Sequence, residues 1–393
     1  MEETQKANIH PGRTKVLGWI TSRITAPEER KSLAKKYAKL VILVAWLPTA
    51  IISAFEGWFY NGTITSFILD PFAQMRLLFA LPLMIIGMPM IENNTKLVAE
   101  YASKNLLNSS DLQKIWEPAV ERARKLVDTP ASRIVIIIVV ILATLRALFL
   151  DAASIIEGDE VRWFGYSTHD QDHLSWAGRY YYLIAMPVFQ YVMYRCLWRY
   201  LVWIWQMIRL SRAELTLTPI HPDRMGGLGI LFQGQFGFIL FFIAINGLAA
   251  GSITYSMIDT GMTFAAARMD ITIWIGTCLV VIFAPMMVFM NDLMQTRKRG
   301  LIEYGIVGTN ISKTFRRQWV EGQVPAEESD RMNPDVTADF STTYGITQDM
   351  LMFPFTLRNI IMMGVGMFIP YVLVLLQIMS VEQLIEKLLN TVL

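Results

Sequence analysis

The feature that most constrains the fold is a series of uninterrupted apolar segments, each close to 20 residues long. A helix of about 20 residues is needed to cross a hydrocarbon core of roughly 30 Å. Because lipid offers no hydrogen-bond partners, the backbone groups of such a segment must bond within it, as they do in a helix. Alternating segments of about ten residues, typical of membrane barrels, are not seen in the sequence. The sequence therefore predicts an all-α, polytopic transmembrane helical bundle.

The composition agrees with this class. The chain has 393 residues, of which 53% are hydrophobic and only 17% are charged, whereas about a quarter of the residues of a soluble domain carry charge. The net charge of +2 is too small to indicate a nucleic-acid partner. Cys196 and Cys278 fall inside apolar segments, so we interpret them as small apolar residues. The lipid bilayer is the expected surrounding, and no cofactor is expected.

Seven segments are predicted to span the membrane. They lie at about residues 39–56, 75–91, 133–150, 176–205, 231–257, 271–291 and 358–379. The second is short and contains Pro82 and Pro89, so it is expected to be kinked. Lysine and arginine gather before the first span and in the connections after the second, fourth and sixth spans, whereas the connections between them lack basic residues or are acidic. Because positively charged connections stay in the cytoplasm, we expect the N-terminus in the cytoplasm and the C-terminus outside.

These spans divide the chain into five parts. They are a basic amphipathic N-terminal segment (1–38), a first three-span half with a cytoplasmic helical extension (39–150), a connector with the outer loop and fourth span (151–229), a second three-span half with a cytoplasmic loop (230–380) and an amphipathic C-terminal helix (381–393). The cytoplasmic loop of the second half is expected at about residues 320–350, where acidic and turn residues gather.

An internal duplication is a further hypothesis. Pro82 and Pro285 are 203 positions apart, and the same offset places Trp116 on Trp319. Spans one to three would then match spans five to seven in the same orientation, with the fourth as a connector. Transporters often contain such parallel repeats, with a binding site at their interface. A coincidental alignment is the alternative, and the sequence leaves both open.

The most unusual local sequence precedes the fifth span on the cytoplasmic side and is TPIHPDRMGGLG. Gly226, Gly227 and Gly229 would let backbone N–H groups approach a ligand, and a helix N-terminus attracts anions. His221 could transfer a proton or ligate a metal, and Asp223 could orient it. The alternative, which we favour, is a tight membrane-entry loop in which Asp223 caps a helix and the glycines permit close packing.

A short resemblance supports a bacterial origin. The stretch HPDRMGGLGIL, which begins at His221, resembles a cytoplasmic loop of uncharacterised bacterial multi-pass inner-membrane proteins. It covers about eleven residues, and no activity is established for that group. The resemblance therefore implies a location, the bacterial inner membrane, and no function.

Two arginines lie deep in predicted spans. Arg146 is about 13 residues into the third span, and Arg195 is about as deep in the fourth, counted from the other side. Charge at membrane depth is costly and is by default a hypothesis of function, here a polar cavity that accepts anions. The alternative is that both side chains snorkel to an interface. For Arg199, one turn beyond Arg195 and near several tryptophans, we favour snorkelling.

The fifth span combines polar and small residues. Gln233 lies near its start, and Gly247 and Gly251 form a pair of small residues four positions apart. Close helix packing is the interpretation that we favour. The alternative is a helix that lines a substrate path, in which Gln233 would contact a ligand.

A metal site in the outer loop has weak support. His169 and His173 are four residues apart, with carboxylates between them, and could hold a metal if the segment were helical. Because the sequence offers no third fixed ligand, a solvated loop is the interpretation that we favour.

Three functions follow as hypotheses. The first, which we prefer, is a channel or transporter for an anionic or amphipathic solute. The second is a membrane scaffold or sensor subunit that binds a membrane or cytoplasmic protein partner. The third is an enzyme for a lipid-linked substrate that uses His221 and Asp223. A homo-oligomer is expected for a protein of this kind.

Overall fold

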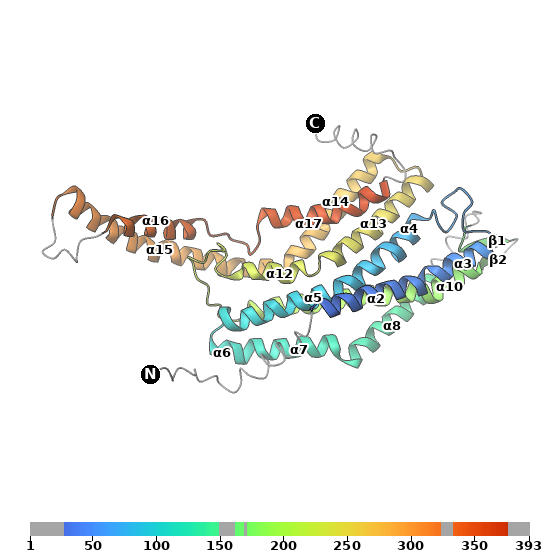
Figure 1. The fold of residues 1–393 in the computed structure, drawn as a ribbon, viewed down its shortest axis with the longest axis horizontal. Helices are drawn as coiled ribbons and strands as arrows, with labels where there is room; N and C mark the ends of the chain where they lie inside the picture. Colours follow the sequence, from blue (N-terminus) through green and yellow to red (C-terminus); the bar gives the residue numbers. More distant parts are fainter. Residues whose placement is uncertain (1–26, 149–161, 169–170, 324–332, 376–393) are drawn as a thin grey trace.

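The computed structural model is an elongated bundle of helices, described for residues 27–148, 162–168, 171–323 and 333–375 (Figure 1). The first half of this bundle passes along its long axis three times. The chain runs toward the end where α3 lies (called up here), back in the opposite direction (down) and then up again. Its elements are α2 (Pro27–Ala45), α3 (Leu47–Phe55), α4 (Pro71–Gln74), η1 (Met75–Ala80), α5 (Leu81–Tyr101), η2 (Ala102–Leu106), α6 (Ser109–Asp111), η3 (Leu112–Trp116), α7 (Glu117–Asp128) and α8 (Pro130–Arg146).

The connector contains a small hairpin and a long helix. The hairpin pairs β1 (Gly165–Thr168) with β2 (Gln171–Leu174) in antiparallel register, Gly165 opposite Leu174. The chain then runs down through α10 (Trp176–Tyr180), η5 (Tyr181–Ala185) and α11 (Met186–Leu210). The hairpin and α10 lie with α3 at one end of the bundle (Figure 1).

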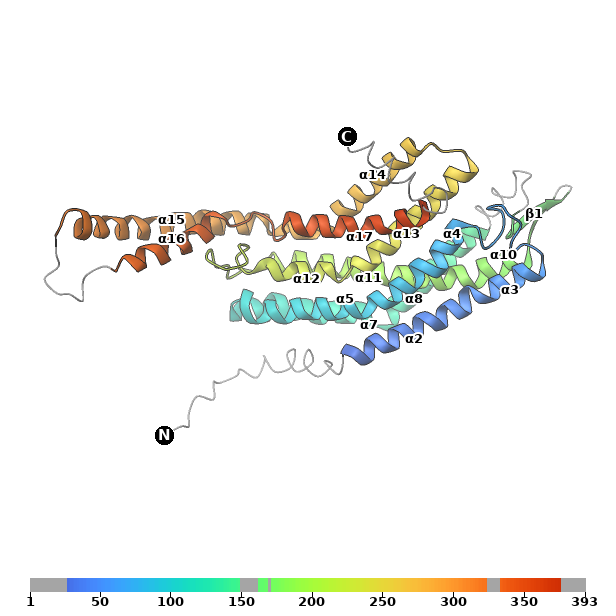
Figure 2. The ribbon, with the colours of Figure 1, turned by 45° about the horizontal axis from the view of Figure 1, so that its top comes forward.

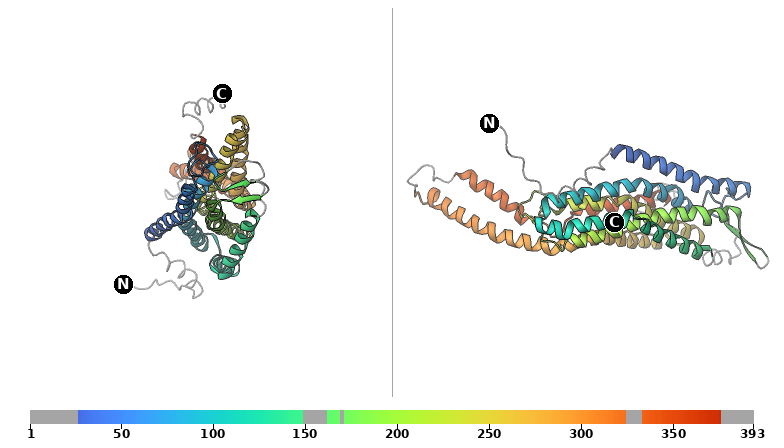
Figure 3. Two further views of the ribbon diagram at one scale, coloured as in Figure 1. Left: turned by 90° about the vertical axis from the view of Figure 1, so that its right-hand side faces the viewer. Right: turned by 90° about the horizontal axis from the view of Figure 1, so that it is seen from below.

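The second half runs up through η6 (Leu228–Ile230), α12 (Leu231–Phe236) and α13 (Ile239–Asp259). It returns through α14 (Phe264–Phe283), η7 (Ala284–Phe289), α15 (Met290–Phe315) and η8 (Arg316–Val320), and it ends with α16 (Pro334–Gln348) and α17 (Leu357–Leu375). Figure 2 shows α14 at the edge of the bundle. Figure 3 shows that α15 and α16 form an antiparallel pair that projects beyond the other helices.

Within the described residues, four helices are long and apolar enough to cross a membrane. They are Ser32–Phe55, Pro71–Leu106, Ile239–Asp259 and Phe264–Val320. A fifth candidate is the pair Lys114–Val127 and Pro130–Arg146, which is bent by 48°, and Leu357–Leu373 is a shorter apolar helix. The structure thus supports a membrane-embedded helical protein with four to five candidate spans and does not confirm seven.

The fourth predicted span is the clearest difference. Its helix, α11, is not among the helices that are apolar enough to cross a membrane. Arg195, Arg199 and Arg209 all belong to α11 and lower its mean hydropathy. Its length and its place beside α5, α7 and α8 nevertheless make it a central element of the bundle.

The cytoplasmic loop expected at residues 320–350 is in part a helix. Residues 334–348 form α16, which packs along α15. Asn333 caps α16 by accepting a hydrogen bond from the backbone N–H of Asp335 at 3.0 Å, and Pro334 fits the first helical position. The expectation of a loop was wrong for these residues. It rested on the acidic and turn residues of the whole segment and gave too little weight to the helix start signals at Asn333 and Pro334. The C-terminal helix expected at 381–393 lies outside the described residues.

The helices α5, α7 and α11 begin in the same way. Pro82, Pro118 and Pro187 are each the second residue of one of these helices, and each helix directly follows a π-helical segment. A proline lacks the N–H group and crowds the carbonyl four residues earlier, and a wider π-helical turn relieves that crowding. The kink expected in the second span therefore takes the form of a π-helical turn at its start.

The internal duplication is not confirmed. Two tryptophans that the offset of 203 positions aligns lie in different places in the two halves. The chain turns back at Leu107, so Trp116 belongs to the returning leg, where its side chain is 1% exposed. The aligned Trp319 lies in η8, ahead of the turn, and its side chain is 45% exposed. The two tryptophans are therefore not in equivalent places. The halves share only the order of a long helix, a returning helix and an apolar helix.

Candidate functional site

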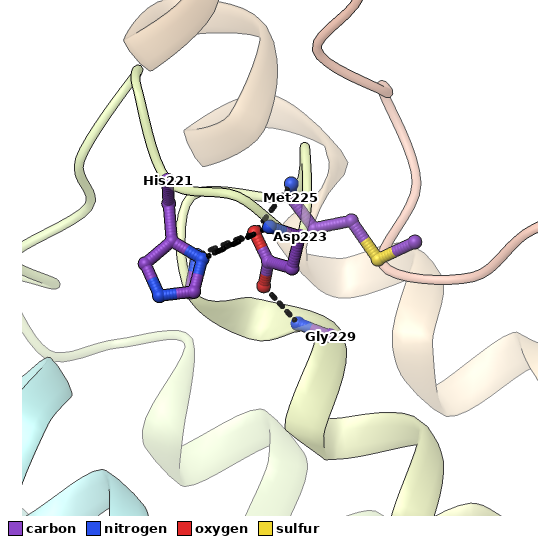
Figure 4. Close-up of polar contacts among 5 residues, drawn as sticks. His221, Asp223, Met225 and Gly229 are labelled. Carbon is purple, nitrogen blue, oxygen red and sulfur yellow. Dashed lines mark hydrogen bonds and ion pairs between the residues drawn. The ribbon is translucent and has the colours of Figure 1, made fainter. Parts of the chain in front are cut away.

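The HPD loop, residues 218–229, is organised by one carboxylate (Figure 4). Oδ1 of Asp223 accepts hydrogen bonds from the backbone N–H groups of Met225 at 2.8 Å and Gly227 at 3.2 Å, and Oδ2 accepts one from Gly229 at 3.0 Å. His221 Nδ1 lies 2.7 Å from Oδ1. Because an ionised carboxylate has no proton to donate, this contact requires the hydrogen on Nδ1. The backbone N–H of Asp223 lies 3.3 Å from the same nitrogen, but an Nδ1 that carries a hydrogen cannot also accept this N–H.

The pKa of Asp223 lies below its ordinary value. Partial burial of the carboxylate acts to raise the pKa, but the three backbone N–H groups and the His221 contact together outweigh it. The ionised carboxylate therefore has its lone pairs occupied by four donors. This arrangement suits a residue that fixes a loop better than one that removes a proton from a substrate.

The HPD loop is also tied to three other parts of the bundle. The N–H of Thr216, just before the loop, donates to the carbonyl of Leu106 at 2.9 Å, at the end of η2. The carbonyl of Arg224 accepts a hydrogen bond from the N–H of Leu351 at 2.7 Å, in the linker before α17. Pro219 packs directly on Gly300 of α15. These contacts support the interpretation as a tight structural loop, with Gly226 and Gly227 at positive φ angles of 63° and 96°.

The two predicted arginines lie in different surroundings. Arg195 donates from Nη1 to the carbonyl of Val127 at 2.9 Å, and Trp198 donates from Nε1 to the carbonyl of Leu126 at 2.8 Å. These carbonyls end α7 at its bend with α8, so Arg195 acts as a cation that caps a helix C-terminus. Arg146 is the last residue of α8, and its side chain is exposed. The structure does not bring the two arginines into one cavity.

Close packing explains the small residues of the fifth span. A Cβ on Gly247 would lie 2.6 Å from the Phe79 ring, and one on Gly251 would lie 2.9 Å from the carbonyl oxygen of Pro71. The side chain of Gln233 is exposed, and its backbone carbonyl accepts a hydrogen bond from the Asn94 side-chain amide at 2.8 Å. The packing interpretation is thus supported by the structure.

The structure gives no support to the metal site predicted at His169 and His173. His169 lies outside the described residues, and His173 is a partly buried residue of β2. Among the residues that the structure describes, no group of three or more histidine, cysteine, aspartate and glutamate side chains could hold a metal ion.

A buried arginine that sequence reasoning missed lies at the hairpin end of the bundle. Arg76 in η1 is 8% exposed, and its guanidinium lies 4.1 Å from the centre of the Phe72 ring and donates to the Tyr181 hydroxyl. Asp70 nearby caps α4 and accepts a hydrogen bond from Trp163 Nε1 at 3.0 Å. Arg76 is the second residue of the predicted second span, so its position at a boundary concealed it.

A polar crevice lies between α5, α7 and α11. Its volume is about 100 Å³, and its polar lining consists of Glu92, Thr95, Lys96, Arg124, Arg199 and Gln206. Lys96 Nζ pairs with Glu92 Oε1 at 2.8 Å, and Arg124 Nη1 lies 3.6 Å from Glu121 Oε2. The Nε atom of Arg199 is buried and has no hydrogen-bond partner among the described residues. The lining contains three basic side chains and one acidic one, and Lys96 and Arg124 each lie beside a glutamate.

The sequence carried only a faint signal of this crevice. Glu92 and Lys96 are spaced by one helical turn directly after the second predicted span, and Arg199 was interpreted as an interfacial residue. The three helices that meet here are far apart along the chain, and only the fold brings them together.

The fold defines a general class, an α-helical membrane-embedded protein, and places a crevice with polar and apolar lining between α5, α7 and α11. Beyond that class, no family model, no curated protein and no solved structure matches the chain. The function must therefore be argued from the geometry alone.

Proposed function

We propose that this protein is a membrane transporter for an anionic amphipathic solute, and that the crevice between α5, α7 and α11 binds the anionic group of that solute. The observation that carries the proposal is the excess of cationic side chains in a confined space. A buried guanidinium N–H without a partner loses free energy, which an anion in the crevice would recover.

The position of the crevice suits an amphipathic molecule. Glu92 and Lys96 lie just beyond the second predicted span, at the depth where a head group meets the cytoplasm in the expected orientation. Apolar residues such as Ile91, Val202 and Trp203 complete the lining. The crevice would therefore hold the anionic group beside apolar side chains, with the rest of the solute outside its volume of about 100 Å³.

The helices around the crevice also have features that permit movement. All three helices that line it begin directly after a π-helical segment, and such segments occur frequently at functional sites. The bend of 48° between α7 and α8 lies beside the crevice, next to Val127. A change in these bends would alter the width of the crevice, as alternating access requires.

Replacing Arg199 by glutamine should weaken binding of an alkyl phosphate about tenfold or more and reduce its uptake. A hydrogen bond to a charged group contributes about 1.5–3 kcal/mol, and about 1.4 kcal/mol corresponds to a factor of ten. Binding is measured by calorimetry on the purified full chain, and uptake is measured in liposomes that contain it.

Arg209→Gln is the matched control. Arg209 is on the same helix, but its guanidinium lies 5.4 Å from the centre of the Trp205 ring and outside the crevice. It should bind and transport like the unaltered protein. Equal behaviour of the two variants, or no phosphate binding by the unaltered chain, would remove the support for this proposal.

A second candidate function, a membrane scaffold or sensor, rests on the projecting pair α15 and α16. The side chains of Ile302 and Ile306 on α15 are 56% and 60% exposed, and a groove of about 610 Å³ lies between the two helices. Loss of a copurifying partner when α16 is removed, with the bundle still folded, would favour this function.

The remaining expectations stay predictions. They are the cytoplasmic N-terminus, the outer C-terminus, the bacterial inner membrane, the homo-oligomer and the duplication. The third hypothesis, an enzyme that uses His221 and Asp223, gains no support because Asp223 is occupied by the loop that it organises.

A further inference from the structure

A second hollow, distinct from the crevice, lies on the opposite side of α11. It is a groove between α11, α13 and α14 with a volume of about 350 Å³, and its surface is wholly apolar. Its lining includes two residues with hydroxyl groups that are turned away. The Tyr200 hydroxyl donates to the carbonyl of Val281 at 2.7 Å, and the Thr277 hydroxyl donates to the carbonyl of Ile273 at 2.8 Å. The groove therefore offers a ligand no hydrogen bonds.

The groove continues into a neighbouring hollow of about 510 Å³. Ile245 and Trp274 line both spaces, and the second ends at Ser252 and Asp270. From Asp270 to Val281 the path follows eleven residues of α14, or about 16 Å at 1.5 Å per residue. This length is about half of a hydrocarbon core of roughly 30 Å, the depth of one leaflet.

The groove faces lipid rather than water. Both α13 and α14 are among the helices apolar enough to cross a membrane. α14 lies at the edge of the bundle (Figures 1 and 2), and its Ile273, Val280 and Val281 side chains are 57%, 69% and 44% exposed. An apolar molecule can thus enter sideways from the bilayer.

The width of the groove limits which molecules can fit in it. On α11 the lining extends from Met193 to Ile204, again about 16 Å, so even the whole empty space of about 860 Å³ gives a mean cross-section of only about 50 Å². A helix about 10 Å across with its side chains has a cross-section of about 80 Å² and does not fit. A single unbranched hydrocarbon chain is narrow enough.

We propose that this groove binds one acyl chain of a bilayer phospholipid, drawn from the leaflet next to the loop between α13 and α14. The chain lies along α14 between the levels of Asp270 and Val281, and its contacts within the groove are entirely apolar. This inference does not depend on transport or on the crevice between α5, α7 and α11.

Trp274 provides the readout of the test. The purified full chain is exchanged into micelles that contain phosphatidylcholine brominated within one acyl chain, and bromine quenches a tryptophan that it touches. Lipid retained after extensive washing is counted by native mass spectrometry. One retained lipid per chain and quenching that is clearly smaller in Trp274→Phe than in the unaltered chain are expected. Quenching that is the same in Trp274→Phe as in the unaltered chain would overturn the proposal.

Thr277→Phe fills the groove, and Thr272→Phe is its matched control. Both threonines are exposed residues of α14 and donate to the carbonyl four residues earlier, but only Thr277 lines the groove. Thr277→Phe should weaken lipid retention about tenfold or more, because the ring displaces roughly two methylene groups of the acyl chain. Thr272→Phe should retain lipid normally. Equal retention in both variants, or a dimer of the chain that only Thr277→Phe dissociates, would show that the groove does not hold an acyl chain.

Discussion

Replacing Gly178 by alanine is expected to disrupt the hairpin end of the bundle and to cost at least about 3 kcal/mol of unfolding free energy. Gly178 is the third residue of α10, and a Cβ there would overlap the carbonyl oxygen of Phe164 and lie 2.8 Å from its carbonyl carbon. These are backbone atoms, so no change of rotamer relieves the overlap, and overpacking already costs 1–3 kcal/mol where side chains can adjust. The measurement is the thermal unfolding midpoint of the purified protein in detergent.

The contacts around Gly178 explain why the hairpin cannot simply move away. The carbonyl of Phe164 accepts a hydrogen bond from the N–H of Ser175 at 3.2 Å, and the Ser175 hydroxyl accepts one from the N–H of Gly178 at 2.8 Å. Glu56, at the end of α3, accepts hydrogen bonds from the N–H groups of Trp176 and Ala177 at 2.8 and 3.0 Å. A shift of Phe164 would therefore break its hydrogen bond to Ser175, the residue that caps α10, and disturb the junction of the hairpin and α10.

Gly276→Ala is the control for this substitution. Gly276 is in α14, where a Cβ would meet nothing within 4 Å. Alanine should be neutral or stabilising there by up to about 1 kcal/mol, because it has the higher helix propensity. Equal unfolding midpoints for Gly178→Ala and the unaltered protein would mean that the close approach of α10 and the hairpin is not as the structure has it.

The sequence predicted the parts of this molecule that depend on local pattern. Apolar segments of the right length identified the membrane-embedded class, and Pro82 indicated a break in the second span. The small residues Gly247 and Gly251 indicated close packing. In each case the physical cause lies within one segment, such as the length of a helix, a missing N–H or a missing Cβ, and so a single sequence reveals it.

The candidate site depends on contacts between segments and was largely missed. Arg195 was expected in a cavity or at an interface, whereas it caps the last turn of α7, a partner 68 residues away. Arg199 was assigned to the interface, although its Nε atom is buried and the residue lines the crevice. Hydropathy shows that an arginine in a span is unfavourable in lipid. It does not show which carbonyl the side chain will bond to or which crevice it will line. That information appears only when α5, α7 and α11 are placed side by side.

Replacing Asp223 by asparagine is the second change with a large expected effect, a loss of about 2–4 kcal/mol of stability at neutral pH. The carboxylate accepts hydrogen bonds from Met225, Gly227 and Gly229, and bonds to a charged acceptor contribute about 1.5–3 kcal/mol each, although not additively. An asparagine side chain keeps one carbonyl oxygen and turns an NH₂ group toward at least one N–H. The measurement is again the thermal unfolding midpoint in detergent, together with protease cleavage of the HPD loop.

The pH dependence distinguishes loss of the charge from general damage. Because the pKa of Asp223 is lower in the folded protein than its ordinary value of 3.8, its contribution to stability is complete above that value and is lost as the pH falls through the lower folded pKa. The difference between Asp223→Asn and the unaltered protein should therefore be constant at neutral pH and shrink in acid below about pH 4. Asp349→Asn is the control. The Asp349 carboxylate lies 3.4 Å from Arg224, and the Asp349 side chain is 60% exposed, so its loss should cost less than about 1 kcal/mol. A difference that stays the same down to pH 3, or an equal loss in the two variants, would show that the ionised Asp223 does not hold the loop.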